Sequence, residues 1–233
     1  MSNDWSQTAD FDLYAGHYDD SINKALSLSG ETRDHFAIKR IEWLAACLKE
    51  RDFRADVVMD FGCGTGSAAP ILQATLGMSS YIGVDTSTGS LDVARKTCNL
   101  GAFHEISEYN PSQEVDVIYC NGVFHHIQPR ERAGAVDYLY RSLKPGAILA
   151  LWENNPLNPV TRYMMSKIPF DRDAITLKAT EAAALVKSGG FSILRIDHLF
   201  IFPRWLSGLR GLERYASGFP VGAQYQVLAR KPL

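Results

Sequence analysis

Three glycines alternate with other residues between positions 62 and 66, directly after an acidic residue, Asp60, and Phe61. The apolar residues 57–59 in front of them are typical of a buried strand. Because glycine lacks a Cβ atom, the backbone of such a turn adopts positive φ values and lets a bound molecule come close. We expect residues 67–76 to form a helix whose N-terminus faces the turn. The pattern predicts a nucleotide-type ligand site at the carboxyl end of a parallel strand.

The spacing of the glycines narrows the choice of ligand. The dinucleotide fingerprint is G-x-G-x-x-G, but here the third glycine comes one residue early, at Gly66, and Ser67 follows. A phosphate-binding P-loop would end in Gly-Lys-Ser or Gly-Lys-Thr, and this chain has neither after the turn. A tight turn that binds nothing would not need three alternating glycines, because each costs chain entropy.

A second strand pattern, residues 81–85, also ends in an acid. Asp85 lies 19 residues after Gly66, near the spacing expected for an acid that accepts hydrogen bonds from ribose hydroxyls. Taken alone, Asp85 would be a surface acid or a helix cap. After a glycine turn the ribose role is favoured, although it does not separate one nucleotide-type ligand from another.

The stretch D-F-G-C-G-T-G, residues 60–66, closely resembles motif I of the class I S-adenosylmethionine (SAM) methyltransferases. SAM has no phosphate, and Asp60 could meet its ammonium group directly or through water. The resemblance implies that SAM is the cofactor and S-adenosylhomocysteine (SAH) the product. The cofactor contacts that we expect from this region are Asp60, Gly62, Cys63, Gly64, Thr65, Gly66, Asp85 and Thr86.

Residues 115–127 resemble the fourth strand and following loop of the same class, which implies that Asn121 and Val123 lie beside the methionine part of the cofactor. Adjacent residues of an extended strand face opposite sides, so we expect at most one of His125 and His126 to point at the ligand. Either one is a general base, or one packs and the other meets solvent. A helical metal pair would be spaced i and i+4, so we predict no metal site.

The stretch L-K-P-G-A at residues 143–147, followed by an apolar run, is frequent in this class. The run ends at Glu153, a further candidate base, and the polar segment 153–159 after it follows the carboxyl end of a strand. This segment resembles a signature of bacterial methyltransferases encoded among glycan and secondary-metabolite genes. A rigid loop held by turn hydrogen bonds is the alternative.

Two weaker signals complete the site. A Y-x-x-x-Y-D pattern near the N-terminus resembles the lid of small class I methyltransferases, which implies that Tyr18, and then Tyr14, contact the cofactor. These aromatic residues would otherwise only anchor the terminal segment on the core. Residues 101–105 read as a weak third strand, and position in the family implies that Glu105 and Ile106 flank the adenine.

The resemblance covers nearly the whole chain and implies an α/β fold. We expect a Rossmann-like, seven-stranded, mostly parallel sheet with helices on both faces and an antiparallel last strand. Residues 1–233 would form a single domain, with an N-terminal lid and helix in residues 1–50 and an insertion over the active site in residues 154–178. We also expect helices over residues 33–49 and 204–215 and a strand over residues 191–202.

Composition agrees with such a domain. The chain has 233 residues, 46% of them hydrophobic, and a formal net charge of −2. It has no dense Lys/Arg cluster, which argues against a nucleic-acid partner. The four cysteines lack C-x-x-C spacing, and the polar N-terminus does not resemble a signal peptide. We therefore expect a cytoplasmic protein with free thiols and no membrane partner; oligomeric state is left open.

The chemistry of SAM suggests the function. Its sulfonium is an activated methyl donor, so the enzyme mainly has to align a nucleophile and exclude water. We predict a methyltransferase for a small-molecule acceptor whose nucleophile is O, N or C, with His126, His125 and Glu153 as candidate bases. Two alternatives remain. One is an NAD(P)-dependent oxidoreductase, disfavoured by the early third glycine and the lack of a second substrate domain. The other is a SAM-binding protein without methyl transfer.

Overall fold

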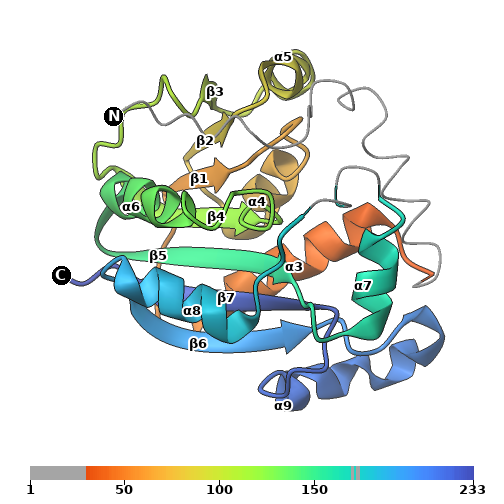
Figure 1. Cartoon of the computed structure of the whole chain (residues 1–233). Helices are drawn as coiled ribbons and strands as arrows, with labels where there is room; N and C mark the ends of the chain where they lie inside the picture. The colour runs from red at the N-terminus through yellow and green to blue at the C-terminus, as the bar shows by residue number, and fades with distance from the viewer. Residues whose placement is uncertain (1–29, 169–170, 172–173) are drawn as a thin grey trace.

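A single seven-stranded sheet organises the chain in the computed structural model, which describes residues 30–168, 171 and 174–233 (Figure 1). The strands are β1 (Val57–Phe61), β2 (Ser80–Asp85), β3 (Ala102–Glu105), β4 (Val115–Asn121), β5 (Leu143–Asn154), β6 (Ser192–Leu199) and β7 (Gln224–Arg230). Their spatial order is β3-β2-β1-β4-β5-β7-β6. Strands β1 to β5 pair in parallel, whereas β7 runs antiparallel to both of its neighbours. The predicted mostly parallel sheet with an antiparallel last strand is confirmed.

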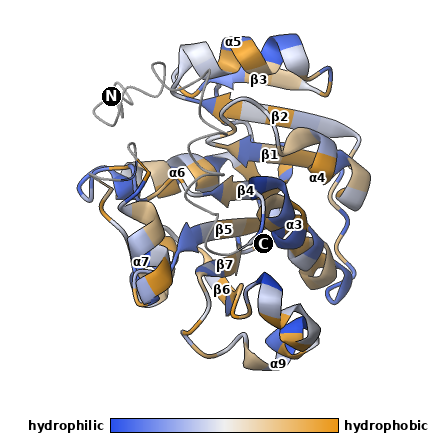
Figure 2. Ribbon diagram, turned by 90° about the vertical axis from the view of Figure 1, so that its right-hand side faces the viewer, coloured by the Kyte–Doolittle hydropathy of each residue, from blue (hydrophilic) through white to orange (hydrophobic). Residues whose placement is uncertain are grey.

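Helices cover both faces of this sheet. They are α3 (Arg33–Lys49), α4 (Ala69–Leu76), α5 (Thr88–Thr97), α6 (Arg132–Ser142), α7 (Pro159–Met165), α8 (Ala179–Ser188), the 3-10 helix η3 (Arg204–Leu212) and α9 (Glu213–Ala216). Helices α3 and α4 lie on one side of the sheet and α6 on the other (Figure 2). Helix α8 packs with α6 against the sheet.

The strands between these helix layers are apolar on both faces, as parallel strands covered on both sides must be. Successive side chains of β1 show this directly. Val58 packs in the cluster that contains Ile41 and Leu44 of α3, whereas Met59 packs in the cluster that contains Val136 of α6. The alternation places Asp60 on the α3 side again, where its carboxylate faces the candidate site.

Helix α3 has the predicted bounds, and its ends explain why. The Thr32 side chain accepts a hydrogen bond from the backbone nitrogen of His35, so it caps the first turn. Asp34 lies in the first turn and Lys49 in the last, each at the end of the helix dipole that its charge favours. The helix carries Arg40 to the carboxyl edge of the sheet.

The C-terminal elements differ from the prediction. Strand β6 ends at Leu199 rather than at residue 202, because Phe200 adopts a φ of 62°, outside the extended region. Residues 204–215 form η3 and the first part of α9 instead of one α-helix. Gly208 and Gly211 lower the helix propensity of this segment, and a short 3-10 form results.

Within the described part of the chain, none of the helices combines the length and the apolar character that a bilayer crossing requires. The four cysteines are free thiols, as their spacing predicted.

Candidate functional site

A cavity of about 1400 Å³ opens at the carboxyl ends of β1, β4 and β5. Side chains from α3, α7 and η3 form its other walls. Most of the residues that the sequence singled out line it: Asp60, Gly62, Cys63, Gly64, Thr65, Asp85, Thr86, Ile106, Asn121, Val123, His125, His126 and Glu153. The loops that follow four different strands therefore meet in one space.

The three alternating glycines are needed at their positions for different structural reasons. All have positive φ, at 75° for Gly62, 52° for Gly64 and 74° for Gly66. A Cβ on Gly62 would lie 2.3 Å from Val123 Cγ2, and one on Gly66 would lie 2.9 Å from the Phe103 ring. A Cβ on Gly64 would meet nothing within 4 Å. Gly62 and Gly66 are thus required by packing, whereas Gly64 presents bare backbone to the open cavity.

Asp85 ties β2 to this turn. One carboxylate oxygen accepts a hydrogen bond from the backbone nitrogen of Gly64 at 2.7 Å, and the other accepts one from that of Ser87 at 2.8 Å. A carboxylate offers about four lone-pair sites, so Asp85 keeps acceptor capacity toward the cavity. It can brace the turn and accept from ligand hydroxyls at the same time.

Asp60 is a buried acid, only 3% exposed. Its carboxylate accepts a hydrogen bond from the Tyr81 hydroxyl at 2.9 Å. Burial raises the pKa of Asp60 to about 7, although the Tyr81 hydrogen bond works in the opposite direction. At neutral pH this carboxylate is poised between its charged and neutral forms, and a cationic ligand would favour the charged one.

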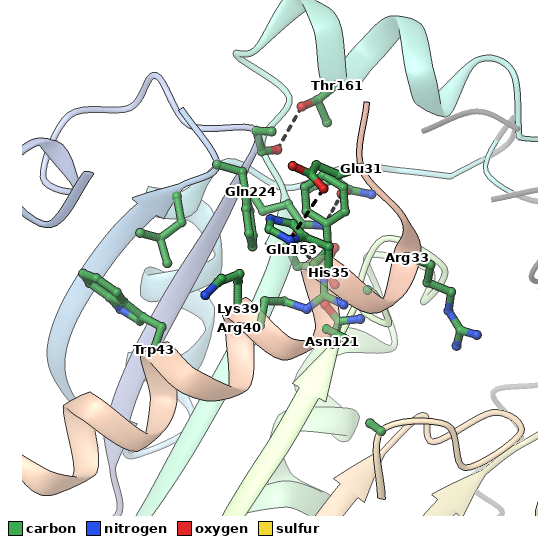
Figure 3. A pocket seen from close by; sticks show the side chains of 18 of the residues that line it. Glu31, Arg33, His35, Lys39, Arg40, Trp43, Asn121, Glu153, Thr161 and Gln224 are labelled. Atoms are coloured by element: carbon green, nitrogen blue, oxygen red, sulfur yellow. Dashed lines mark hydrogen bonds and ion pairs between the residues drawn. The ribbon is translucent and has the colours of Figure 1, made fainter. Parts of the chain in front are cut away.

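Arg40, 6% exposed, points from α3 into the same cavity (Figure 3). Its Nε donates to the Tyr119 hydroxyl at 3.1 Å, and its Nη1 donates to Gln224 Oε1 at 2.8 Å. Tyr119 is the register partner of Asp60 on the neighbouring strand, so the guanidinium and the Asp60 carboxylate lie on the same face of the sheet. A negative and a positive group, both buried, therefore face one region of the cavity.

The two histidines are placed differently from the prediction. Residues 122–127 form a turn rather than an extended strand, and the rings of His125 and His126 lie side by side with centroids 4.0 Å apart. Both Nε2 atoms face one oxygen of Asp171, at 3.6 Å from His125 and 3.4 Å from His126. The alternation rule failed here because it applies only to extended backbone.

Glu153 holds the ring of His125 through the ring nitrogen that faces away from Asp171. Its Oε2 lies 2.5 Å from His125 Nδ1, and its Oε1 accepts a hydrogen bond from the backbone nitrogen of Phe124 at 2.7 Å. Burial alone would lower the pKa of His125, but the charge of Glu153, the close contact with it and the nearby Asp171 raise the pKa to about 10. Burial and the charge on His125 lower the pKa of His126 to about 3. The site therefore holds two unlike imidazoles between two carboxylates.

Comparison with known proteins shows what the central part of the chain is similar to. A family model described as a methyltransferase domain matches residues 59–149, the stretch from the glycine turn to β5. Trans-aconitate 2-methyltransferase of Methylobacterium nodulans is 28% identical over 137 residues, which are 58% of this chain and 52% of that protein. Over residues 59–149 the chain is therefore similar to methyltransferase domains, as the glycine turn led us to expect. It spans about half the length of the curated relatives it matches.

Solved methyltransferases share the fold over almost the whole chain. A SAM-dependent methyltransferase of Thermotoga maritima, described as a possible histamine N-methyltransferase, is 19% identical with a TM-score of 0.63, covering 95% of this chain and 98% of its own. The plantazolicin methyltransferase BpumL, solved with SAH, is 13% identical with a TM-score of 0.62, covering 95% and 98%. These similarities support SAM as the cofactor of the matched domain.

Some of the predicted cofactor contacts do not line the cavity. Gly66 packs against Phe103 instead, and Glu105 is not among the lining residues. Tyr14 and Tyr18 lie outside the described residues.

Two cavity residues escaped the sequence reasoning. Arg40 was not among the predicted site residues, because a charged side chain on a helix is in solvent by default; its neighbours Ile41 and Leu44, which are buried, are the signal that could have placed it. Asp171 comes from the predicted 154–178 insertion, whose path over the site is set by tertiary contacts. The only local signal was an acid after Pro169 and Phe170 in a segment expected to cover the site.

Proposed function

We propose that this chain transfers the methyl group of SAM to a small-molecule acceptor bound in the cavity. The observation that carries the proposal is that one cavity is lined both by the glycine turn and by the cluster of His125, His126, Glu153 and Asp171. A methyl donor and an acceptor must meet in one closed space, because transfer requires in-line approach to the S–CH₃ bond. The cavity, at about 1400 Å³, exceeds the usual ~300–1,000 Å³ of a site for one small ligand.

The cofactor end of the cavity has charges that suit an amino acid. SAM carries an ammonium and a carboxylate on its methionine part. In the proposed pose Asp60 meets the ammonium and Arg40 meets the carboxylate. The bare backbone at Gly64 lets the cofactor lie close, Asp85 accepts from the ribose, and Ile106 flanks the adenine. Asn121 and Val123 border the methionine part.

The end of the cavity that contains His125, His126 and Glu153 would bind the acceptor and remove its proton. We assign His125, His126 and Glu153 to the loss of the acceptor's proton, with Glu153 holding His125 in place. Residues of the insertion, among them Thr161, Met165 and Ile168, line the space beside this cluster and would contact the acceptor. The apolar side chains there suit an acceptor with an apolar body and one polar reacting group.

Two acceptor classes come first in the panel of acceptors to test. The resemblance of the segment 153–159 supports an acceptor from glycan or secondary-metabolite synthesis, and the similarity to trans-aconitate 2-methyltransferase supports a small organic acid as an alternative.

Calorimetric titration with SAH and, in parallel, with NADH tests which cofactor the cavity binds. We expect micromolar binding of SAH and none of NADH. Transfer of a labelled methyl group from SAM to members of an acceptor panel then tests the reaction. Binding of SAH without transfer to any acceptor class would favour a SAM-binding protein that does not methylate. Binding of NADH alone would overturn the proposal.

His126→Ala distinguishes the contribution of the acceptor end of the cavity from that of the cofactor end. The change removes a side chain that faces the acceptor end and leaves the glycine turn intact. We expect a lower kcat with SAH affinity within about twofold of the wild type. An unchanged rate with an identified acceptor would remove His126 from the reaction.

A further inference from the structure

The cluster beside the acceptor end has the geometry of a metal site. One Asp171 oxygen lies 3.4 Å from His126 Nε2 and 3.6 Å from His125 Nε2, and one ligand atom from each of the three residues lies within 4.8 Å of the others. Hydrogen bonds between nitrogen and oxygen are usually shorter, about 2.7–3.2 Å. Ligand atoms on a tetrahedral ion with bonds of about 2.0–2.2 Å are, by contrast, about 3.3–3.6 Å apart. The separations of 3.4 and 3.6 Å match the edges of such a tetrahedron.

The surroundings of His125 are those of a metal ligand with a supporting carboxylate. Nδ1 of His125 points at Glu153 Oε2, so a proton on Nδ1 leaves the Nε2 lone pair facing Asp171 and the cavity. Glu153 is itself held by the backbone nitrogen of Phe124. The ring orientation is thereby fixed before any ion arrives.

Asp171 is also held in place. Backbone bonds join its nitrogen to the Ile168 carbonyl and its carbonyl to the nitrogen of Ala174, at 3.1 and 3.2 Å. The nitrogen of Ile175 donates to the His125 carbonyl at 2.8 Å, which ties the insertion directly to the histidine turn. Two segments far apart in sequence thus present their ligand atoms to one point.

The cluster holds an imidazole between two buried carboxylates. Glu153 and Asp171 are 2% and 8% exposed, and within the described ranges their ion-pair partners are His125 and His126 rather than a lysine or arginine. A divalent ion would replace the proton between His125 and Asp171 and keep the buried carboxylates paired. Two imidazoles and one carboxylate form a ligand set that suits divalent transition metals.

We propose that His125, His126 and Asp171 bind one divalent transition-metal ion, with an open position toward the cavity for an oxygen of the methyl acceptor. This site rests on the proposed function only for its role, not for its existence. An acceptor hydroxyl bound to the ion has a lowered pKa and loses its proton to water. Its O–C bond then forms as the S–CH₃ bond of SAM breaks, and SAH keeps the electron pair on sulfur. The ion, held by His125 and His126 with Glu153 behind His125, is thus the means by which this cluster removes the acceptor's proton.

Metal binding can be measured without any acceptor. The full-length protein is stripped with a chelator, dialysed and titrated with Zn²⁺, Mn²⁺ and Co²⁺, and the Co²⁺ form is followed by its visible absorption. We expect one equivalent of bound metal. Removing a ligand in His126→Ala or Asp171→Asn should weaken binding at least tenfold. His104→Ala, which alters a histidine outside the cavity, should bind as the wild type does.

The same samples separate this proposal from the proposed function. SAH titration reports on the glycine turn, and thermal unfolding reports on folding. Binding of SAH with no metal uptake by the wild type would overturn the metal site and leave methyl transfer intact. Metal uptake that the ligand variants do not reduce would also overturn it. One equivalent of metal in a protein that does not bind SAH would support the metal site while the proposed function fails.

Discussion

The carboxylate of Asp85 accepts a hydrogen bond from the backbone nitrogen of Gly64 over 2.7 Å, and this bond joins the end of β2 to the glycine turn after β1. The two residues are 21 positions apart. From the sequence we predicted Gly64 and Asp85 as separate contacts to the ligand. The hydrogen bond shows that the two act together, because Asp85 holds in place the backbone of Gly64 that the cofactor is to approach.

Asp85→Ala should therefore damage the fold as well as the site. It leaves the nitrogens of Gly64 and Ser87 without their carboxylate partner, at a cost of about 1–3 kcal/mol. We expect the Tm to fall by several degrees and SAH binding to be lost. Thermal unfolding and calorimetry on the same preparation check both. A variant that keeps the wild-type Tm and loses only SAH affinity would show that Asp85 acts on the ligand alone.

Gly64→Ala and Gly77→Ala form a matched pair. Both glycines have positive φ, 52° and 65°, and neither would meet another atom within 4 Å on gaining a Cβ. The cost to the fold should be alike, about 1–2 kcal/mol, because both place alanine in the left-handed region. Only Gly64 lines the cavity.

We expect SAH affinity to fall at least tenfold in Gly64→Ala and to stay unchanged in Gly77→Ala. Calorimetry at a temperature well below both Tm values makes the comparison. Equal affinity in the two variants would mean that the cofactor does not approach the turn.

Features of the fold and of the site could be predicted from the sequence where the residues that determine them are close together in the chain. The buried strands, the glycine turn and the acids near the ends of β1 and β2 could be predicted, because each signal lies in consecutive residues. The positive φ of Gly62 and Gly64 follows from the same pattern.

Relations between distant segments could not be predicted. Arg40 is buried because α3 presents it to Tyr119 and Gln224, residues 79 and 184 positions away. The doublet of histidines was judged by the geometry of a strand, but the backbone turns after Gly122, whose φ is 69°. Asp171 reaches both rings only through the tertiary path of the insertion.

Arg40→Gln tests whether the buried guanidinium binds a carboxylate. SAH has one and 5′-methylthioadenosine does not, although both share the adenosine part. Hydrogen bonds to a charged group contribute about 1.5–3 kcal/mol, so we expect SAH affinity to fall about tenfold to a hundredfold. The affinity for methylthioadenosine should change by less than about twofold. Calorimetry with both ligands decides. An equal loss for the two would show that Arg40 supports the cavity walls instead of contacting the amino-acid part.

The pKa of Asp60 predicts how cofactor binding depends on pH. If the ammonium of SAH requires the ionised carboxylate, binding is supported above pH 7 and lost as the pH falls through that value. Lowering the pH from 8 to 6 should weaken SAH about tenfold, because one proton then competes with the ligand.

Asp60→Asn gives the matching control. The amide oxygen can still accept from the Tyr81 hydroxyl, so the local hydrogen bond survives. We expect weak SAH binding that no longer varies between pH 6 and 8. The folded-state pKa lies above the ordinary value, so ionisation of Asp60 destabilises the fold as the pH rises through about 7. At pH 8 the Asn variant should therefore melt several degrees above the wild type. A lower Tm together with unchanged SAH affinity would show that Asp60 is a structural acid.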